Sequence, residues 1–342
     1  MTTKRTFSFV AVVAAAALAL TGCAAGEGSS LDQPAAAGEW STDTLNIDFA
    51  TYNPLSLIIK DKGWLEDELG DGVTVNWVQS AGSNKANEAL RAGAIDVGST
   101  AGSAALLARS NGSPIQAIDI YSQPNWAAIL VPADSTITSV EGLKGKSIAA
   151  TKGTDPYFFL LQALEEAGLS LDDVDVQNLQ HADGKAALES GAVDAWSGLD
   201  PLLSTSVAEA DSKIIYDNID FNSYGFLNAA ESFIADSPDV AQVVVNAYEK
   251  AREYAIANPD EVAAILAEVA AIDPAIATTQ LTERTNFEID PAPGQAQLDV
   301  LTIIGPVFVE SGDVKDQASI DDALATLFNT QFIDKADPAA IG

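Results

Sequence analysis

The chain has 342 residues, of which 47% are apolar, with 49 acidic and 17 basic side chains and a formal net charge of −32. Its length predicts two globular units with sizeable cores, and its charge argues against a nucleic-acid partner, because a polyanion is bound by a basic surface. The sequence holds one histidine and one cysteine, which leaves few ways to build a metal site, a disulfide or a catalytic triad.

The N-terminal segment has the pattern of a secretory leader. Two basic residues precede an apolar run over 7–20, which is shorter than a membrane span requires. The run ends at Leu20-Thr21-Gly22-Cys23, which resembles the lipobox of bacterial lipoproteins, where the cysteine is acylated and becomes the mature N-terminus. An unpaired thiol in an ordinary leader is the alternative. We expect a signal peptide at 1–22 and a flexible tether at 23–44, because small and acidic residues cannot bury apolar surface.

The first half of the body predicts alternating strands and helices. A buried strand is expected at 45–50, an amphipathic helix at 54–69 and an alternating strand at 73–78. Within Ala89–Ser99 a helix ends at Gly93, since glycine accepts the left-handed conformation just past a helix end, and a short strand follows. These elements make one β-α-β-α-β unit.

The same order of elements returns about 100 residues later. A strand is expected at 147–150, a helix at 156–167 and a strand at 174–179. Ala187–Ser197 then matches Ala89–Ser99 at an offset of 98, with six of eleven positions identical. Two copies of the unit predict an α/β protein with two lobes, each built on a mostly parallel sheet with helices on both faces.

The rest of the chain adds one strand, at 214–216, a return crossing at 222–230 and a helical C-terminal part. The expected helices lie at 238–257, 259–270, 274–285, 292–311 and 320–328.

The C-terminal helices are expected on the first lobe. This assignment gives a first lobe of 45–120 and 222–342 and a second lobe of 121–221. The two chain crossings, near 118–124 and 220–224, would then form a hinge.

Parallel sheets of this kind bind ligands at the carboxyl ends of their strands, so six loops of the two lobes should face one cleft. The candidate ligand-binding residues on and beside these loops are Tyr52, Asn53, Gln79, Ser80, Ser99, Thr100, Trp126, Gly153, Thr154, Asp155, Trp196 and Asp200.

Two helix starts in this set could bind an anion without a basic side chain. Ser99-Thr100 precedes one helix and Gly153-Thr154 another, and the first turn of a helix presents free N–H groups and a partial positive charge. Ordinary helix capping by these hydroxyls is the alternative. Tyr52, Trp126 and Trp196 could wall the organic part of a ligand, although core packing explains each aromatic residue taken singly.

The loops offer little for catalysis. Asp96 and Asp194 occupy equivalent positions of the repeat, where an aspartate more often caps local backbone than transfers protons. His181 lies in a cleft loop without a partner near it in sequence, and a structural role is favoured over a ligand contact. We therefore expect no enzyme activity, no metal and no cofactor.

With these elements in hand, the sequence resembles the substrate-binding proteins of bacterial ABC importers in the aliphatic sulfonate, taurine and nitrate family. The resemblance covers roughly 45–335. The residues that carry it are Trp77–Ser83, Ala89–Thr100, Leu143–Ala149, Lys152-Gly153-Thr154, Val193–Trp196 and Asp200-Pro201.

The resemblance implies a two-lobed periplasmic-binding-protein fold of type II with two chain crossings. It also implies that backbone amides and hydroxyls of Ser80, Ser99-Thr100 and Gly153-Thr154 hold a sulfonate, while the tail lies toward the loops of Tyr52-Asn53 and Trp196–Asp200. The sequence departs from the family at Asp155-Pro156, where relatives often continue with hydroxyls, and at Leu199, where they often carry an aromatic residue. An amine-bearing ligand such as taurine gains weight from the carboxylates of Asp155 and Asp200.

The expected function is capture of a small organosulfonate, an alkanesulfonate or taurine, by a lipid-anchored monomer outside the cytoplasm. The implied partners are the permease and ATPase subunits of an ABC importer. Nitrate or a thiamine-precursor pyrimidine is the alternative ligand. A cytoplasmic-type enzyme on the same fold and a surface adhesin are the other classes, and the leader with Cys23 favours the receptor over the enzyme.

Overall fold

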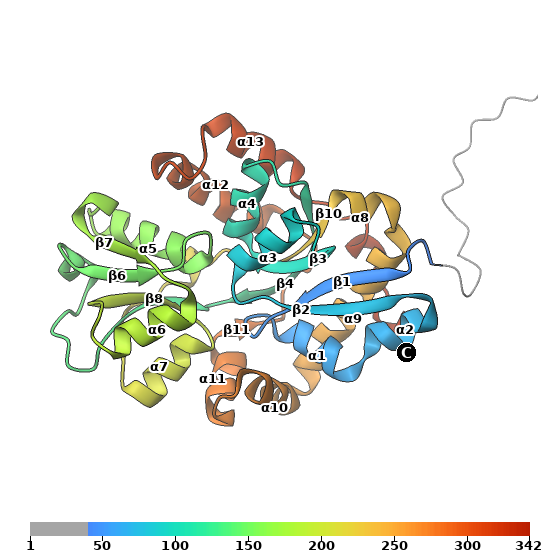
Figure 1. Cartoon of the computed structure of the whole chain (residues 1–342), viewed down its shortest axis with the longest axis horizontal. Helices are drawn as coiled ribbons and strands as arrows, with labels where there is room; N and C mark the ends of the chain where they lie inside the picture. The colour runs from blue at the N-terminus through green and yellow to red at the C-terminus, as the bar shows by residue number, and fades with distance from the viewer. Residues whose placement is uncertain (1–39) are drawn as a thin grey trace, which may run out of the picture. The chain divides into compact units, whose positions relative to one another are not determined.

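The computed structural model describes residues 40–342. The expected signal peptide, the lipidation site Cys23 and most of the expected tether lie outside the described residues. Within the described part, the chain forms two β-sheets flanked by helices (Figure 1).

The first sheet has six strands in the order β11-β4-β10-β3-β1-β2. Only β2-β1-β3 is parallel, and the other neighbours are antiparallel. The strands are β1 (Thr44–Phe49), β2 (Thr74–Gln79), β3 (Val97–Ala101), β4 (Ile115–Pro124), β10 (Gly225–Ala230) and β11 (Thr285–Asn286). The helices between the first four strands are α1 (Pro54–Lys62), α2 (Trp64–Leu69), α3 (Ser83–Arg91) and α4 (Gly102–Ser110).

The second sheet has five strands in the order β7-β6-β8-β5-β9, and only β7-β6-β8 is parallel. Its strands are β5 (Ala127–Val131), β6 (Ser147–Ala150), β7 (Asp175–Asn178), β8 (Ala195–Leu199) and β9 (Lys213–Tyr216). Its helices are α5 (Asp155–Glu166), α6 (His181–Glu189) and α7 (Leu202–Ala210). The parallel parts of the two sheets have the same order, as the repeat predicts. A mostly parallel sheet was the wrong expectation for either lobe, because the crossings add antiparallel strands.

The repeated aspartates hold equivalent strands together. Asp96 accepts hydrogen bonds from the N–H of Asn46 at 2.8 Å and from its side-chain amide at 3.0 Å. Asp194 accepts from the N–H of Ser147 at 2.9 Å and from its hydroxyl at 3.0 Å. Each carboxylate therefore ties the end of one helix–strand turn to the start of the central strand, and the expected backbone-capping role of both residues is confirmed.

The first expected helix is broken in two. Gly63 adopts a left-handed conformation with φ 67°, and its N–H bonds the carbonyl of Ile59 at the end of α1. α2 starts directly afterwards at Trp64. The apolar periodicity continues through Gly63, so it predicts one helix, whereas the glycine ends the first one because it takes this conformation without steric cost.

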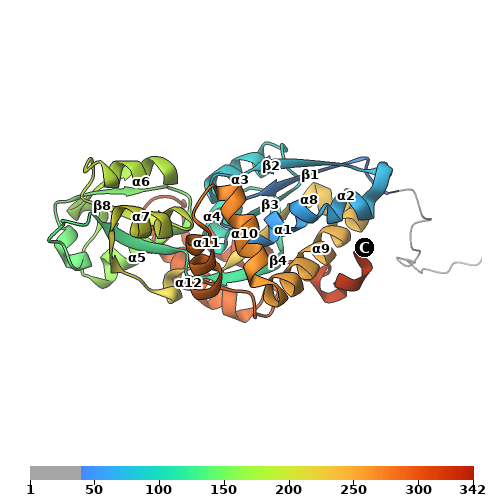
Figure 2. The ribbon, with the colours of Figure 1, turned by 90° about the horizontal axis from the view of Figure 1, so that it is seen from below.

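The helical C-terminal part follows β10. Its helices are α8 (Glu231–Asp236), α9 (Pro238–Ala257), α10 (Pro259–Ala270), α11 (Pro274–Glu283), α12 (Gln295–Glu310) and α13 (Gln317–Thr326). In Figure 2, α9 lies beside α1 and α2, which it contacts. α12 and α13 contact α4, and α12 also reaches the second lobe, where Phe308 packs on Phe158 of α5 with ring centroids 4.3 Å apart. Short 3-10 turns occupy Gly70–Gly72, Val140–Leu143, Leu171–Asp173, Ile219–Phe221, Ile333–Lys335 and Pro338–Ala340.

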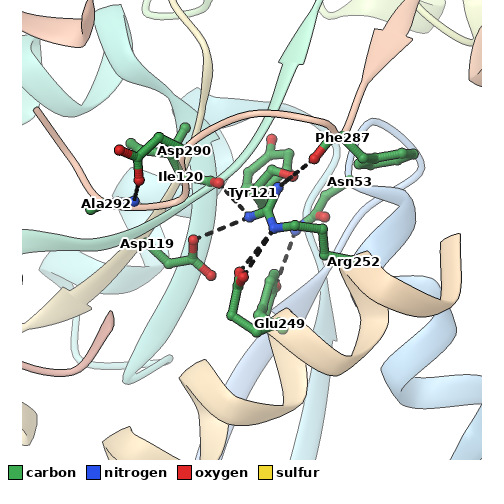
Figure 3. A network of polar contacts seen from close by, with 10 residues as sticks. Asn53, Asp119, Ile120, Tyr121, Glu249, Arg252, Phe287, Asp290 and Ala292 are labelled. Atoms are coloured by element: carbon green, nitrogen blue, oxygen red, sulfur yellow. Dashed lines mark hydrogen bonds and ion pairs between the residues drawn. The ribbon is translucent and has the colours of Figure 1, made fainter. Parts of the chain in front are cut away.

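A buried arginine anchors β4 where the chain leaves the first lobe (Figure 3). The guanidinium of Arg252 in α9 donates to the carbonyls of Ile120 at 2.6 Å and Tyr121 at 3.1 Å. It also pairs with Glu249 at 3.0 Å and with Asp119 at 3.4 Å. Burial raises the pKa of Asp119, against the effect of the Arg252 charge. Removing either partner would leave a buried charge uncompensated, so this network fixes the strand that leads into the hinge.

The two chain crossings are hydrogen-bonded to each other. The side chain of Asn222 on the return crossing accepts from the N–H of Ala127 at 3.1 Å and donates to the side chain of Asn125 at 3.2 Å. β4 continues to Pro124, so the expected lobe boundary at 120 falls inside this strand. Among residues 40–342, no helix combines the length and apolarity that crossing a membrane demands.

Candidate functional site

A cavity of about 370 Å³ lies between the two lobes, at the carboxyl ends of their parallel strands. Its first-lobe residues include Tyr52, Gln79, Ser80 and Lys85, and its second-lobe residues include Gln180, His181, Leu199 and Asp200. The volume falls in the range typical of small-molecule sites. The cleft expected from the repeat is therefore present, with Tyr52, Gln79, Ser80 and Asp200 on its wall as expected.

One wall of the cavity is apolar and comes from both lobes. Val269, Ala270 and Ile272, at and beyond the end of α10, face the cavity together with Leu199 and Leu202. Val269 keeps 42% of its surface exposed. This wall suits the organic tail of a ligand.

The polar side of the cavity has one cation. Lys85 lies on its wall and pairs with Glu88 at 2.8 Å, with 45% of the lysine side chain exposed. Gln180, His181 and Ala182 are the N-cap and first two residues of α6 and also line the cavity. Because the first N–H groups of a helix have no partner within the helix, this wall offers donors to an anion.

His181 is buried and neutral at pH 7. Its Nδ1 lies 3.2 Å from the hydroxyl of Thr151, which already donates its hydrogen to the carbonyl of Leu179 at 2.7 Å. Nδ1 therefore donates to the hydroxyl and carries the ring's proton, which leaves Nε2 as a bare acceptor. Burial lowers the pKa of His181 to about 4. A Cβ added at Gly82 of the first lobe would lie 3.0 Å from Nε2, so the two lobes touch at this ring.

A second buried titratable group lies behind the cavity wall. Asp48 is fully buried in β1 and accepts from the N–H of Ser99 at 2.9 Å and from its hydroxyl at 3.1 Å. Burial raises the pKa of Asp48 to about 7, and hydrogen bonds from Ser80 and Ser99 oppose the rise. Tyr52 donates to the carbonyl of Ser99 at 2.9 Å. This network fixes the two cavity residues Ser80 and Tyr52 from behind.

A third polar cluster lies at the hinge, away from the cavity wall. The carboxylate of Asp155 at the start of α5 accepts from the hydroxyls of Ser103 at 2.6 Å and Ser223 at 2.5 Å. It also accepts from the indole N–H of Trp126 at 2.8 Å and the backbone N–H of Ser223 at 2.9 Å. Trp126 packs edge-on against Tyr52, with ring centroids 6.1 Å apart. Trp126 thus belongs to the hinge cluster, and it supports the cavity wall through its contact with Tyr52.

The predicted anion site at the start of α4 is occupied by the chain itself. The N–H groups of Ala101 and Ser103 donate to the hydroxyls of Ser83 and Ser223 at 2.9 and 2.8 Å, and that of Gly102 donates to the carbonyl of Tyr224 at 3.1 Å. The return crossing lies so close that a Cβ on Gly102 would sit 2.3 Å from the Ser223 carbonyl oxygen.

The hydroxyls of the two predicted helix starts are also turned inward. Ser99 donates to Asp48, and the Thr100 hydroxyl donates to the Ala101 carbonyl at 2.9 Å while accepting from Asn228 at 2.8 Å. Thr154 donates to the carbonyl of Thr151 at 2.7 Å. None of these hydroxyls lines the cavity, because each meets an acceptor in its own lobe. Gly153 lies on a different surface hollow, beside α3.

Two further candidates belong to the protein interior. Asn53 is fully buried, caps α1 by accepting from the N–H of Ser56 at 3.3 Å and donates to the hydroxyl of Tyr248 at 3.0 Å. Trp196 is fully buried in a small core of the second lobe and packs against Gly184. Both were expected to contact ligand, and the structure corrects that expectation, since neither lines the cavity.

The two carboxylates that favoured an amine-bearing ligand are already paired. Asp200 lines the cavity, but it forms an ion pair with Arg284 at 2.6 Å and accepts from the hydroxyl of Ser204 at 2.6 Å. Asp155 has the four donors described above. Neither carboxylate is left for an ammonium group, so the sequence argument for taurine over a plain alkanesulfonate falls.

Two groups of cavity residues were not singled out in the sequence. Lys85 lies in the first turn of α3, and the α10 residues are distant in sequence from every strand end. An exposed lysine beside the Ser80 loop was the one available signal. A larger hollow of about 530 Å³ lies between α7 and α11, away from the strand ends. Among the described residues, no cluster of three or more potential metal ligands occurs.

The comparisons with known proteins follow this geometry. The model of the family described as NMT1/THI5 like matches residues 55–262. A relative from Bacillus subtilis (strain 168), named for aliphatic sulfonate binding, is 32% identical over 228 residues, which cover 65% of this chain and 68% of that protein. A relative of the same name from Escherichia coli (strain K12) is 28% identical over 259 residues, covering 75% and 81%.

Solved structures agree on the fold. The alkanesulfonate-binding protein SsuA from Xanthomonas axonopodis pv. citri, bound to MOPS, superposes with a TM-score of 0.74 at 24% identity, covering 82% of this chain and 98% of that one. The desulfurization enzyme DszB also has this fold, with a TM-score of 0.63 at 16% identity, covering 86% and 98%. The expected two-lobed fold is confirmed, and the fold by itself is shared by binding proteins and enzymes.

Proposed function

The chain belongs to the NMT1/THI5-like family, and from this premise we propose that it captures a small organosulfonate for an ABC importer. The observation that carries the proposal is the interlobe cavity, which combines an ammonium group, a helix start and an apolar wall. The names of the relatives, which refer to aliphatic sulfonate binding, support this ligand class.

In this proposal the sulfonate lies at the polar side of the cavity. The first N–H groups of α6 approach the anion beside Ser80, and Lys85 supplies the positive charge. The tail lies against Val269 and Leu199. No free carboxylate faces an amine here, so a plain alkanesulfonate binds at least as tightly as taurine.

The same proposal gives the place of action. The receptor works outside the cytoplasm, held to the membrane by acylated Cys23, and hands its ligand to permease and ATPase subunits as a monomer. The leader pattern and the lipobox support this placement. Replacement of Cys23 by alanine is expected to release the protein from the membrane fraction with ligand affinity unchanged. Membrane retention equal to that of the wild type would contradict the lipid anchor.

We also propose that the protein has no turnover, although an enzyme shares its fold. The cavity wall holds one histidine, and its proton-bearing nitrogen faces Thr151 and not the ligand. The test is incubation of the full chain with each tight ligand and analysis of the recovered ligand by mass spectrometry. Product formation above trace level would overturn this part of the proposal.

The ligand class is tested by calorimetric titration of the full chain with ethanesulfonate, taurine, nitrate and an aminopyrimidine. We expect ethanesulfonate to bind. Lys85→Ala should weaken it by roughly ten- to a hundredfold, because this substitution removes one bond to a charged group. Lys144→Ala, on an exposed surface away from the cavity, is the matched control and should bind like the wild type. Binding of nitrate or the pyrimidine alone would refute the sulfonate assignment.

A further inference from the structure

The hinge cluster around Asp155 has the composition of an anion-binding site whose anion is part of the chain. Four donors converge on one carboxylate, two on each oxygen. They come from Ser103 in the first turn of α4, from Trp126 on the outward crossing and from Ser223 on the return crossing. All of them are at most 3% exposed, and the carboxylate itself is 1% exposed.

The charge of Asp155 is balanced by these dipoles alone. Within residues 40–342, no Lys, Arg or His lies within ion-pair distance of this carboxylate. Burial raises the pKa of Asp155, and the bonds from Ser103, Ser223 and Trp126 hold it down. Anion-binding proteins solvate sulfate and carboxylate groups in the same way, with hydroxyls and N–H groups at helix starts and no counter-charge.

The start of the corresponding helix in the first lobe shows that this arrangement is not a by-product of the repeat. Asn53 caps α1 and turns its side chain to Tyr248, inside its own lobe. Thr154 holds the equivalent N-cap position of α5 and also bonds within its lobe. Asp155, the next residue, is the one that reaches across to Ser103 of the other lobe.

We propose that Asp155 is a built-in anion that fills the site between the starts of α4 and α5, links the lobes at the hinge and excludes a ligand's anionic group from that site. A tethered carboxylate competes at a high effective concentration, and its charge repels a second anion. The claim that Asp155 excludes the ligand's anion rests on the proposed function. It places the ligand's sulfonate at the side of the cavity formed by Ser80, Lys85 and the start of α6. Asp155 thus restricts where the ligand's anion binds without contacting the ligand.

The first experiment empties the site and refills it from solution. Asp155→Ala leaves the four donors around a space the size of a carboxylate, whereas Asp155→Asn keeps the space filled, because its amide can accept from the two N–H groups and donate to the two hydroxyls. Thermal unfolding of the full chain is measured in about 100 mM sodium formate and in equal sodium chloride. We expect formate to raise the Tm of Asp155→Ala by about 3 °C, saturably, and to leave the wild type and Asp155→Asn unchanged.

An equal effect of formate on all three proteins would overturn the built-in anion. The claim that Asp155 excludes the ligand's anion is tested by a separate measurement, which does not require Asp155→Ala to fold. Ethanesulfonate is titrated into the wild type and Asp155→Asn, and we expect affinities within about threefold, because the sulfonate binds elsewhere. A gain of tenfold or more in Asp155→Asn would mean that the ligand's anion uses the hinge site. Absence of sulfonate binding in every variant would overturn the proposed function and the claim of exclusion, while the formate result decides the built-in anion by itself.

Discussion

Each lobe buries one carboxylate near the end of its central strand, and the two are held in different ways. Asp48 in the first lobe is 0% exposed and accepts from Ser99 in the same sheet. Asp155 in the second lobe is 1% exposed and accepts from residues of the other lobe and of both crossings. Neither forms an ion pair with a basic residue of 40–342.

The difference shows which polar groups the repeat preserves. Asp96 and Asp194 accept from residues at equivalent positions, Asn46 and Ser147, because both sheets need the same tie between neighbouring strands. Counted from those ties, Asp48 corresponds to Ala149, which packs in an apolar core. The two buried carboxylates therefore have no counterparts across the repeat, and each has to be explained by its own surroundings.

The largest expected effect tests whether ionisation of the buried Asp48 carboxyl destabilises the folded protein more than the other buried groups do. Its folded pKa of about 7 lies above the ordinary 3.8, so the folded state holds this proton longer, and stability falls as pH rises from about 4 to 7. The loss is roughly 4 kcal/mol at 1.36 kcal/mol per pKa unit. Asp48→Asn should not show this loss of stability between pH 4 and 7, because its side chain does not titrate. Urea unfolding of both proteins at pH 4 and 8 measures the difference, and a pH-independent difference would contradict the burial account.

A buried base in the second lobe should act with the opposite sign. The folded pKa of His181, about 4, lies below the ordinary 6.5, so its stabilising contribution is complete above pH 6.5 and is lost as pH falls toward 4. The expected loss is roughly 3 kcal/mol. His181→Gln removes this titration, so the stability gap to the wild type should change across that window. Because the chain has one histidine, its NMR signals give the pKa directly, and a value near 6.5 would refute the burial.

A double-mutant cycle tests whether Trp126 stabilises the folded protein through its hydrogen bond to Asp155. Trp126→Phe removes one donor to the carboxylate and keeps the aromatic contact with Tyr52, so it should cost roughly 1.5–3 kcal/mol of unfolding free energy. The cost should shrink in the Asp155→Asn background. Trp77→Phe is the matched control, since that indole donates to the more exposed Glu66 at 2.7 Å and should cost less than about 1 kcal/mol. Equal losses of unfolding free energy in Trp126→Phe and Trp77→Phe would show that the buried bond to Asp155 contributes no more than an exposed one.

The smallest effect is expected at Thr154, where the sequence argument placed the sulfonate. Its hydroxyl already donates to the Thr151 carbonyl, so Thr154→Ala should change ethanesulfonate affinity by less than about threefold, against ten- to a hundredfold for Lys85→Ala. Calorimetric titration of both variants compares them. A loss of tenfold or more at Thr154 would return the anion site to the hinge.

Much of the architecture follows from local sequence. Strong apolar periodicity and the Asn-Pro and Asp-Pro boundaries place α9, α10 and most strands within a few residues of the expected bounds. The matching Ala89–Ser99 and Ala187–Ser197 segments predict two equivalent sheets and a cleft at their strand ends, because parallel strands with right-handed crossovers leave few other arrangements.

Tertiary structure decided which loop residues meet a ligand. A sequence places Ser99, Thr154 and Trp196 near a strand end, but only the fold shows that Ser99 turns to Asp48, Thr154 to its own loop and Trp196 into a core. It also brings Lys85 and the end of α10 to the cavity and surrounds Asp155 with donors from three distant segments. The physical reason is that a buried polar group takes the nearest partner in space, and spatial neighbours at such separations are set by packing and not by local pattern.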